Sequence, residues 1–227
     1  MNEGIINIEP VREKIAAAAI KSGRDAKDIT LVAVTKTVDA SRIKQAVMQG
    51  VSEFGENRVQ ELLEKYDEIP NVHWHLIGHL QTNKVKYIID KVDLIQSVDS
   101  LKLAEEINLR AKAIDKCQRV LIQVNIEGEE SKFGIFIDDC EKLLLSIAEL
   151  SNIKVCGLMT IPPLYPDLEQ TRKVLQKCNN LFVDIREKRY HNITMEILSM
   201  GMSEDFELAI EEGATMVRLG RTIFGTR

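Results

Sequence analysis

Short apolar runs alternate along the chain with stretches in which apolar residues recur every three or four positions. The first run, residues 29–35, is continuous and rich in β-branched residues, so it predicts a buried strand. The next stretch, residues 39–50, places its apolar residues on one face, as an amphipathic helix does. Asp39 can cap the start of this helix and Gly50 its end.

The same alternation continues to the end of the chain. Further strands are expected at residues 53–55, 73–77, 94–98, 119–126, 153–159, 195–200 and 216–219. Further helices are expected at residues 58–66, 83–89, 101–113, 138–150, 168–188 and 204–212, and one more precedes the first strand.

Strict alternation of strands and helices indicates parallel strands joined by right-handed crossovers. Eight such units in a chain of 227 residues predict an α/β fold, a (β/α)₈ TIM barrel with an extra N-terminal helix. A doubly wound open sheet is the alternative. No linker or break in composition interrupts the pattern, so residues 1–227 are expected to form a single domain.

Composition excludes several classes of function. The net charge of −5 argues against a nucleic-acid interface, which needs a basic patch. No apolar run is long enough to cross a bilayer, and the first residues lack the basic region of a signal peptide. The four cysteines match no metal-binding spacing, which favours free thiols in the cytoplasm. No apolar interface stripe stands out, so a monomer is expected.

If the fold is a barrel, its function lies at the carboxyl ends of the strands. Lys36 follows the first strand directly, where it would be partly desolvated. Partial burial lowers the pKa of a lysine and frees its amine for Schiff-base chemistry. The alternative is a lysine that keeps its charged end in water beyond the strand.

Two glycine-bearing segments follow the last two predicted strands, where barrels often bind phosphate. In SMGMSED, at residues 199–205, Ser203 is either the N-cap of the next helix or a phosphate ligand. In RLGRTIFG, at residues 218–225, Arg218 lies inside the strand and is expected to point into the barrel. A buried arginine there needs an acceptor, either a protein group or a ligand atom.

Other motifs of catalysis are absent from the sequence. There is no GxGxxG, GxxxxGK[ST] or GxSxG segment. His73 and His75 share one face of a strand, but no further ligand follows at a fixed spacing, so no metal site is expected. His79 follows the same strand and is a candidate for lining the pocket.

Six segments carry a resemblance to a known family. They are AVTKT around Lys36, FGENRVQE at 54–61, WHLIGHLQTNK at 74–84, GLMTI at 157–161, LSMGMSED at 198–205 and VRLGRTIFG at 217–225. In order and spacing they resemble the pyridoxal-phosphate homeostasis proteins. That family is similar to the N-terminal barrel domain of alanine racemase, a fold-type III enzyme.

The resemblance implies a role for eight residues. Lys36 would hold pyridoxal 5′-phosphate as a Schiff base, and Arg218 would face the pyridine nitrogen. Ser203 and the backbone of Gly220 and Arg221 would hold the phosphate. The residues around the ring would be Asn57, His79 and Met200. Arg221 departs from the many members that have threonine or serine there, so only a backbone contact to phosphate would survive.

The resemblance implies a cofactor-binding module rather than a dedicated catalyst. It would hold and release the cofactor within the cell, and apo-enzymes that depend on this cofactor are possible acceptors. An amino-acid racemase is the alternative, but alanine racemases take their second base from another domain of a partner chain. This sequence leaves no room for such a domain after Gly225. A barrel that binds another phosphorylated metabolite, with Lys36 as a plain charge, is the third reading.

Overall fold

The apolar runs of the sequence form parallel strands that close into a barrel. The computed structural model describes residues 6–129, 132–163, 165 and 167–225. The strands of the ring are β1 (Thr30–Val34), β2 (Glu53–Glu56), β3 (His73–Leu76), β4 (Leu94–Val98), β5 (Gln118–Asn125), β7 (Ile153–Met159), β8 (Ile193–Ser199) and β9 (Met216–Leu219). Each strand pairs with the next, and β9 pairs with β1 to close the ring. The predicted eight-stranded parallel barrel is therefore confirmed.

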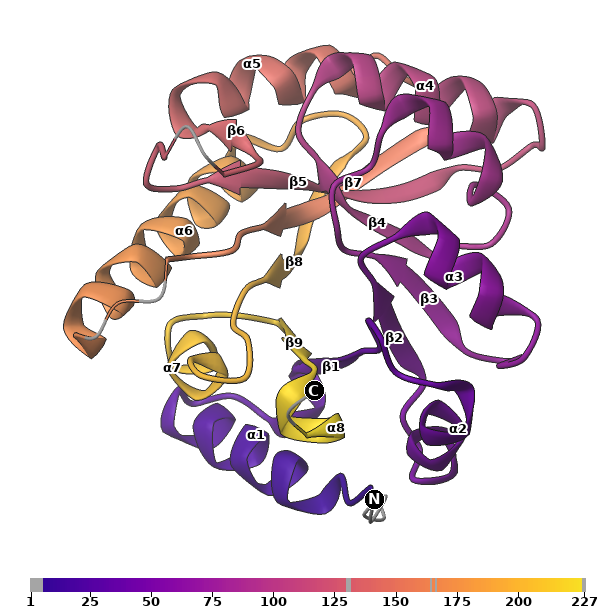
Figure 1. Ribbon diagram of the computed structural model, residues 1–227. Coiled ribbons are helices and arrows are strands. Elements are labelled where there is room, and N and C mark those ends of the chain that lie inside the picture. Colours follow the sequence, from indigo (N-terminus) through magenta and orange to yellow (C-terminus); the bar gives the residue numbers. More distant parts are fainter. Residues whose placement is uncertain (1–5, 130–131, 164, 166, 226–227) are drawn as a thin grey trace.

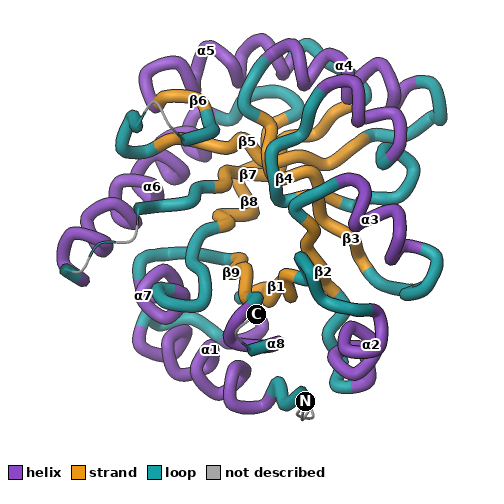
Figure 2. Tube along the Cα trace, viewed as in Figure 1, coloured by secondary structure: helices purple, strands orange, loops and turns teal. Residues whose placement is uncertain are grey.

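Helices surround the ring of strands (Figures 1 and 2). They are α1 (Glu9–Lys21), α2 (Ala40–Met48), α3 (Val59–Tyr66), α4 (Leu101–Lys112), α5 (Ile137–Ala148), α6 (Leu168–Lys188), α7 (Phe206–Glu211) and α8 (Arg221–Phe224). Two 3₁₀ helices complete the set, η1 (Ala26–Asp28) and η2 (Thr82–Tyr87). The predicted N-terminal helix is α1, which lies beside α7, and Lys14 forms a salt bridge of 3.3 Å with Glu207.

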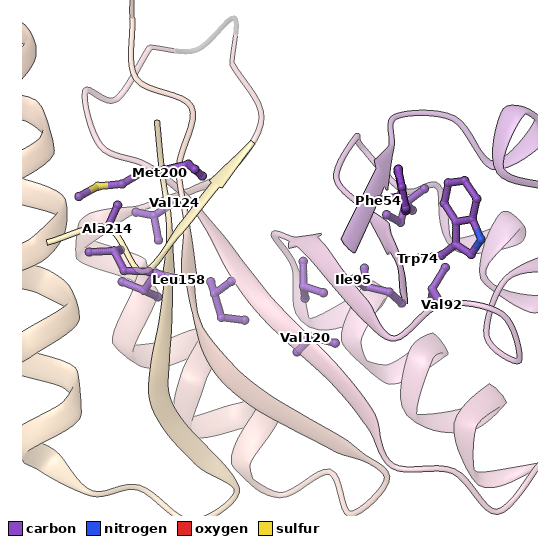
Figure 3. Packing of buried hydrophobic residues seen from close by; sticks show 14 of the residues in the cluster. Phe54, Trp74, Val92, Ile95, Val120, Val124, Leu158, Met200 and Ala214 are labelled. Atoms are coloured by element: carbon purple, nitrogen blue, oxygen red, sulfur yellow. The ribbon is translucent and has the colours of Figure 1, made fainter. Parts of the chain in front are cut away.

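The core has two layers because successive residues of a strand point to opposite faces. One layer lies between strands and helices, where the rings of Phe54 and Trp74 pack with centroids 5.8 Å apart (Figure 3). The other fills the barrel interior and consists of Val32, Leu94, Leu121, Cys156, Met159 and Met216, with Ile197 packed against it. The barrel interior is thus filled below its carboxyl end, and the mouth above it leaves room for a ligand.

Three local details differ from the sequence prediction. The helix expected at residues 83–89 is the 3₁₀ helix η2. The two-residue strand β6 (Ile135–Phe136), paired with β5 outside the ring, is too short to leave a periodic pattern. Helix α7 begins at Phe206, and its N-cap is Asp205, so Ser203 is not the cap of this helix.

The described residues contain neither a membrane-spanning helix nor a cluster of metal ligands. No helix among them is long and apolar enough to span a membrane. No group of three or more histidine, cysteine, aspartate or glutamate side chains in that part of the chain is arranged to hold a metal ion. The four cysteines are free thiols, and three of them are buried.

Candidate functional site

A cavity of ≈ 490 Å³ opens at the carboxyl ends of the strands. This volume lies within the range of about 300–1,000 Å³ that is typical of small-molecule sites. The residues that line it are Val34, Lys36, Asn57, Ile77, Ile161, Met202, Ser203, Glu204, Arg218, Gly220 and Arg221. They come from the carboxyl ends of several strands and from the loops that follow them, as barrel sites do.

A larger cavity, of ≈ 630 Å³, lies at the opposite end of the barrel between α1 and the amino ends of β1 and β2. Its cations already have partners: Arg12 donates to the carbonyl of Gln49 at 2.7 Å, and Lys27 pairs with Asp25 at 3.1 Å. Barrels of this kind place their chemistry at the carboxyl end. We therefore take the cavity that contains Lys36 as the functional site.

Lys36 enters the cavity from the turn that follows β1. The backbone N–H of Thr35 donates to the carbonyl of Gly55, so the end of β1 is tied to β2 directly before Lys36. The Lys36 side chain is half-buried, and within the described chain its amine has neither a hydrogen bond nor a salt bridge. A lysine amine held at a cavity without a partner is available to a ligand.

The loops after β8 and β9 meet at the edge of the cavity. The Oγ of Ser203 accepts a hydrogen bond of 3.3 Å from the backbone N–H of Thr222. Arg221 bridges the same two loops through a 2.7 Å salt bridge to Glu204. The backbone N–H groups of Gly220 and Arg221 find no acceptor among the described residues. Together these groups offer a hydroxyl and N–H donors to an anion.

Arg218 lies at the floor of the cavity and points into the barrel, as the sequence predicted. It is buried, and its guanidinium donates to the Oγ of Ser199 at 2.6 Å and to the carbonyl of Thr160 at 2.8 Å. Burial lowers the pKa of Arg218 to about 10, and attraction from Asp205 opposes this only in part. The guanidinium therefore stays charged at neutral pH.

A chain of hydrogen bonds continues from Arg218 through the barrel interior. The Oγ of Ser199 donates to Oε1 of Gln96 at 2.7 Å. The amide nitrogen of Gln96 lies 2.9 Å from Nδ1 of His75, and Nε2 of His75 lies 2.8 Å from a carboxylate oxygen of Glu53. Because the Gln96 amide donates to Nδ1, the ring proton of neutral His75 is on Nε2 and points to Glu53. His75 is thus a structural member of this chain.

Asp205 shapes the loop between β8 and α7. One carboxylate oxygen accepts a 2.7 Å hydrogen bond from the backbone N–H of Met202, and the other has no partner in the described chain. Gly201 precedes this turn with a φ of 93°, and an added Cβ would lie 2.6 Å from the Cβ of Ala209. Burial raises the pKa of Asp205, and the Met202 hydrogen bond and the charge of Arg218 lower it by less.

Gly78 allows the loop after β3 to approach the loop after β2. A Cβ at this position would lie 2.2 Å from the backbone oxygen of Asn57. No side chain fits in that space, so the contact requires glycine. Asn57 is thereby held at the rim of the cavity.

The comparisons with known proteins agree with this geometry. The profile of the alanine racemase N-terminal domain matches residues 6–227. A pyridoxal phosphate homeostasis protein of Aquifex aeolicus is 45% identical over 219 residues, covering 96% of this chain and 95% of that protein. The chain belongs to the pyridoxal phosphate homeostasis protein family.

Solved structures give the same fold. The structure of PipY from Synechococcus elongatus PCC7942 with PLP bound has a TM-score of 0.84 and 32% identity, covering 95% of this chain and all of that one. Alanine racemase from Clostridium difficile 630 has a TM-score of 0.76 at 19% identity, and 58% of its chain is covered. At 19% identity, the similarity to the racemase shows only that the two proteins share the barrel fold.

Six of the eight residues singled out from the family resemblance line the cavity. They are Lys36, Asn57, Ser203, Arg218, Gly220 and Arg221. Met200 is instead fully buried between barrel and helices, since Ser199 before it faces the barrel interior. His79 lies outside the lining, with its ring stacked on Phe133 at 4.1 Å and Nδ1 3.7 Å from Asp99.

Sequence reasoning missed the residues that support the site from behind. Ser199 was considered only as part of the SMGMSED segment, and Gln96 was given no role, although together they connect Arg218 to the far side of the barrel. A polar residue at an inward position of a strand was the available signal. Behind Lys36, Glu56 was considered only as a polar residue at a strand end, and Glu61 and Lys65 on α3 were given no role.

Proposed function

We propose that this chain binds pyridoxal 5′-phosphate in the cavity of ≈ 490 Å³ and holds it as a Schiff base on Lys36. The observation that carries the proposal is that Lys36, Ser203 and Arg218 line one cavity. The family relatives support it through their name, and the PipY structure supports it through its bound PLP.

The groups around the cavity suit the parts of this cofactor. The Ser203 hydroxyl and the N–H groups of Gly220 and Arg221 suit a phosphate, which forms charge-assisted hydrogen bonds with such donors. The amine of Lys36, which has no partner among the described residues, suits an aldehyde, with which it would form a Schiff base. Arg218 presents N–H donors from the floor of the cavity, which suits a ring nitrogen that accepts.

We propose further that the protein has no dedicated catalytic turnover. When bound, this cofactor supplies an electron sink whose strength depends on a protonated ring nitrogen. Arg218 only donates hydrogen bonds and is charged at neutral pH, so it opposes a proton on a nitrogen that it faces. An aspartate in its place would favour that proton.

A racemase needs a second acid or base on the opposite side of the substrate from Lys36. The described chain offers no tyrosine for this role. The hydroxyl of Tyr165 donates to Glu127 at 2.9 Å, and Tyr190 bonds to Glu141. Neither residue lines the cavity, and neither do Tyr66 on α3 and Tyr87 on η2. The geometry therefore favours binding over racemisation.

The physiological role that we propose is to hold and release the cofactor inside the cell. The name of the curated relatives supports this role. Apo-enzymes that depend on the cofactor are the acceptors that we propose, with a single domain over residues 1–227 acting as a monomer. Location in the cytoplasm stays a prediction from the cysteine pattern.

Reduction of the loaded protein with borohydride, followed by mass spectrometry of its peptides, tests the proposal. Borohydride converts a Schiff base into a stable secondary amine, which marks both the ligand and its lysine. We expect one modified peptide, with the pyridoxal phosphate mass on Lys36. A protein that carries no such mass, or carries it on Lys84 or Lys132, would contradict the proposal.

A further inference from the structure

A buried ion pair lies behind the turn that carries Lys36. Glu56, the last residue of β2, is fully buried, and Nζ of Lys65 on α3 donates to its Oε1 at 2.7 Å. The Oγ1 of Thr35 donates to the same oxygen at 2.6 Å. Because removing two charges from water offsets most of their attraction, such a pair is weak evidence of a stabilising role. Its contacts with the backbone indicate a different role.

The two peptide groups of Lys36 are both held by side chains of α3. Nζ of Lys65 also donates to the carbonyl oxygen of Thr35 at 2.8 Å, which fixes the peptide group before Lys36. The Oε2 of Glu61 accepts a 2.8 Å hydrogen bond from the N–H of Thr37, which fixes the peptide group after it. Lys65 and Glu61 are joined by a salt bridge of 3.5 Å. With both peptide groups fixed, the direction of the Lys36 Cα–Cβ bond is fixed too.

The backbone at Thr37 shows that the turn needs this support. Thr37 has a φ of 60°, in the left-handed region that a β-branched residue rarely adopts. Strain of this kind persists only where the surrounding structure holds it in place. Two contacts hold it here, the hydrogen bond from Thr37 to Glu61 and the backbone hydrogen bond of 2.9 Å from the N–H of Val38 to the carbonyl of Thr35. Burial raises the pKa of Glu61, but the Thr37 hydrogen bond and the charge of Lys65 lower it by more, which keeps the acceptor charged.

We propose that Glu56, Glu61 and Lys65 are positioning residues that direct the amine of Lys36 into the cavity. None of the three lines the cavity, so they act through Lys36 alone. Both glutamates belong to the FGENRVQE segment of residues 54–61, for which the cavity itself uses only the asparagine. The inference rests on the proposed function, since it concerns the capture of the cofactor aldehyde by Lys36.

A double-mutant cycle between Glu61 and Lys36 tests the proposal. Glu61→Gln is made in the wild-type chain and in the Lys36→Ala chain, and affinity for pyridoxal phosphate is measured by equilibrium dialysis. Glu64→Gln is the matched control, because Glu64 lies exposed on the same helix. With Lys36 present we expect Glu61→Gln to weaken affinity about tenfold, because the amide lacks the charge that strengthens the hydrogen bond from Thr37 and that attracts Lys65. In the Lys36→Ala chain the same change should alter affinity less than about twofold.

A second readout separates positioning from a general loss of structure. Borohydride reduction followed by intact-protein mass spectrometry gives the fraction of bound cofactor that is covalently linked. Glu61→Gln should lower this fraction while its thermal unfolding midpoint stays near that of Glu64→Gln.

Each remaining outcome contradicts one claim in particular. If Glu61→Gln lowers the affinity equally in both chains, or in neither, the positioning role is overturned. The proposed function still holds in that case, provided that borohydride links the cofactor to Lys36 in the wild-type protein. A wild-type protein that binds no pyridoxal phosphate overturns the proposed function, and this inference with it.

Discussion

The hydroxyl oxygen of Ser203 accepts a hydrogen bond from the backbone nitrogen of Thr222, 3.3 Å away and 19 residues later in the chain. This contact joins the loops after β8 and β9 without any ligand. An anion that binds there meets donors already in place, so little ordering of the loops is needed on binding. The phosphate end of the cavity is therefore largely preformed.

The first prediction concerns the phosphate. Pyridoxal without its phosphate should bind at least ~100-fold more weakly than pyridoxal phosphate, because several charge-assisted hydrogen bonds of about 1.5–3 kcal/mol each are lost. Equilibrium dialysis with the two compounds measures the ratio. Ser203→Ala should lower this ratio of affinities, since that variant lacks one of the phosphate contacts. Equal affinities for the two compounds would show that these loops are not the anchor.

The second prediction concerns the lysine. Lys36→Ala should abolish the visible absorption of the loaded protein while the free energy of unfolding changes by about 0.5 kcal/mol or less, because Lys36 has no partner in the described chain. Absorption spectra and urea denaturation provide the two measurements. Lys84→Ala, on η2, is the control and should keep the absorption. If the absorption band persists in Lys36→Ala, the Schiff base forms on another residue and the site assignment is wrong.

The third prediction concerns amino acids. With L-alanine and bound cofactor, the protein should form D-alanine at a trace or undetectable rate, because Arg218 opposes a proton on the ring nitrogen. Chiral chromatography of the reaction mixture measures the yield. Turnover at about 1–10³ s⁻¹, as enzymes show, would require a racemase with a second base that lies outside the cavity residues named above.

The fourth prediction concerns the pH dependence of stability. The pKa of Asp205 is raised above its ordinary value of 3.8 in the folded protein, chiefly by burial. A raised pKa stabilises the fold below pH 3.8, and this contribution is lost as pH rises through the folded-state value. Asp205→Asn keeps the acceptor for the Met202 N–H but does not titrate. The free energy of unfolding of this variant, relative to wild type, should therefore rise between about pH 4 and pH 7.

Urea denaturation at three pH values across that window measures the difference. Asp184→Asn, at an exposed position of α6, is the control, because an exposed carboxylate loses little hydration on folding. A flat or falling difference for Asp205→Asn would contradict the prediction.

The sequence was sufficient for the barrel because short strand-like segments, most of them rich in apolar residues, alternate regularly with helical ones. The predicted bounds of β4, β7 and β9 match the structure, and those of β1 differ by one residue at each end. Of the two roles that the sequence left open for Ser203, the structure rules out the N-cap of α7, because Asp205 holds that position and Ser203 contacts Thr222. A partner that lies 19 residues away leaves no local signal in the sequence.

The site was predictable where a side chain lies on a strand or directly after it, as Lys36 and Arg218 do. Beyond the last strand residue, spacing does not determine which way a side chain points, and His79 turns to stack on Phe133. The hydrogen bonds by which Glu61 and Lys65 hold the peptide groups on both sides of Lys36 were not predictable either. These contacts depend on how α3 packs beside the end of β1, and helical periodicity alone does not determine that packing.

The hydrogen-bond chain that begins at Arg218 has a consequence for protein design. Its members Ser199, Gln96, His75 and Glu53 stand on β8, β4, β3 and β2. Grafting the arginine alone onto another barrel would leave a buried charge without its acceptors. The transferable unit is thus a set of residues on five strands, a cross-section of the whole scaffold rather than a local motif.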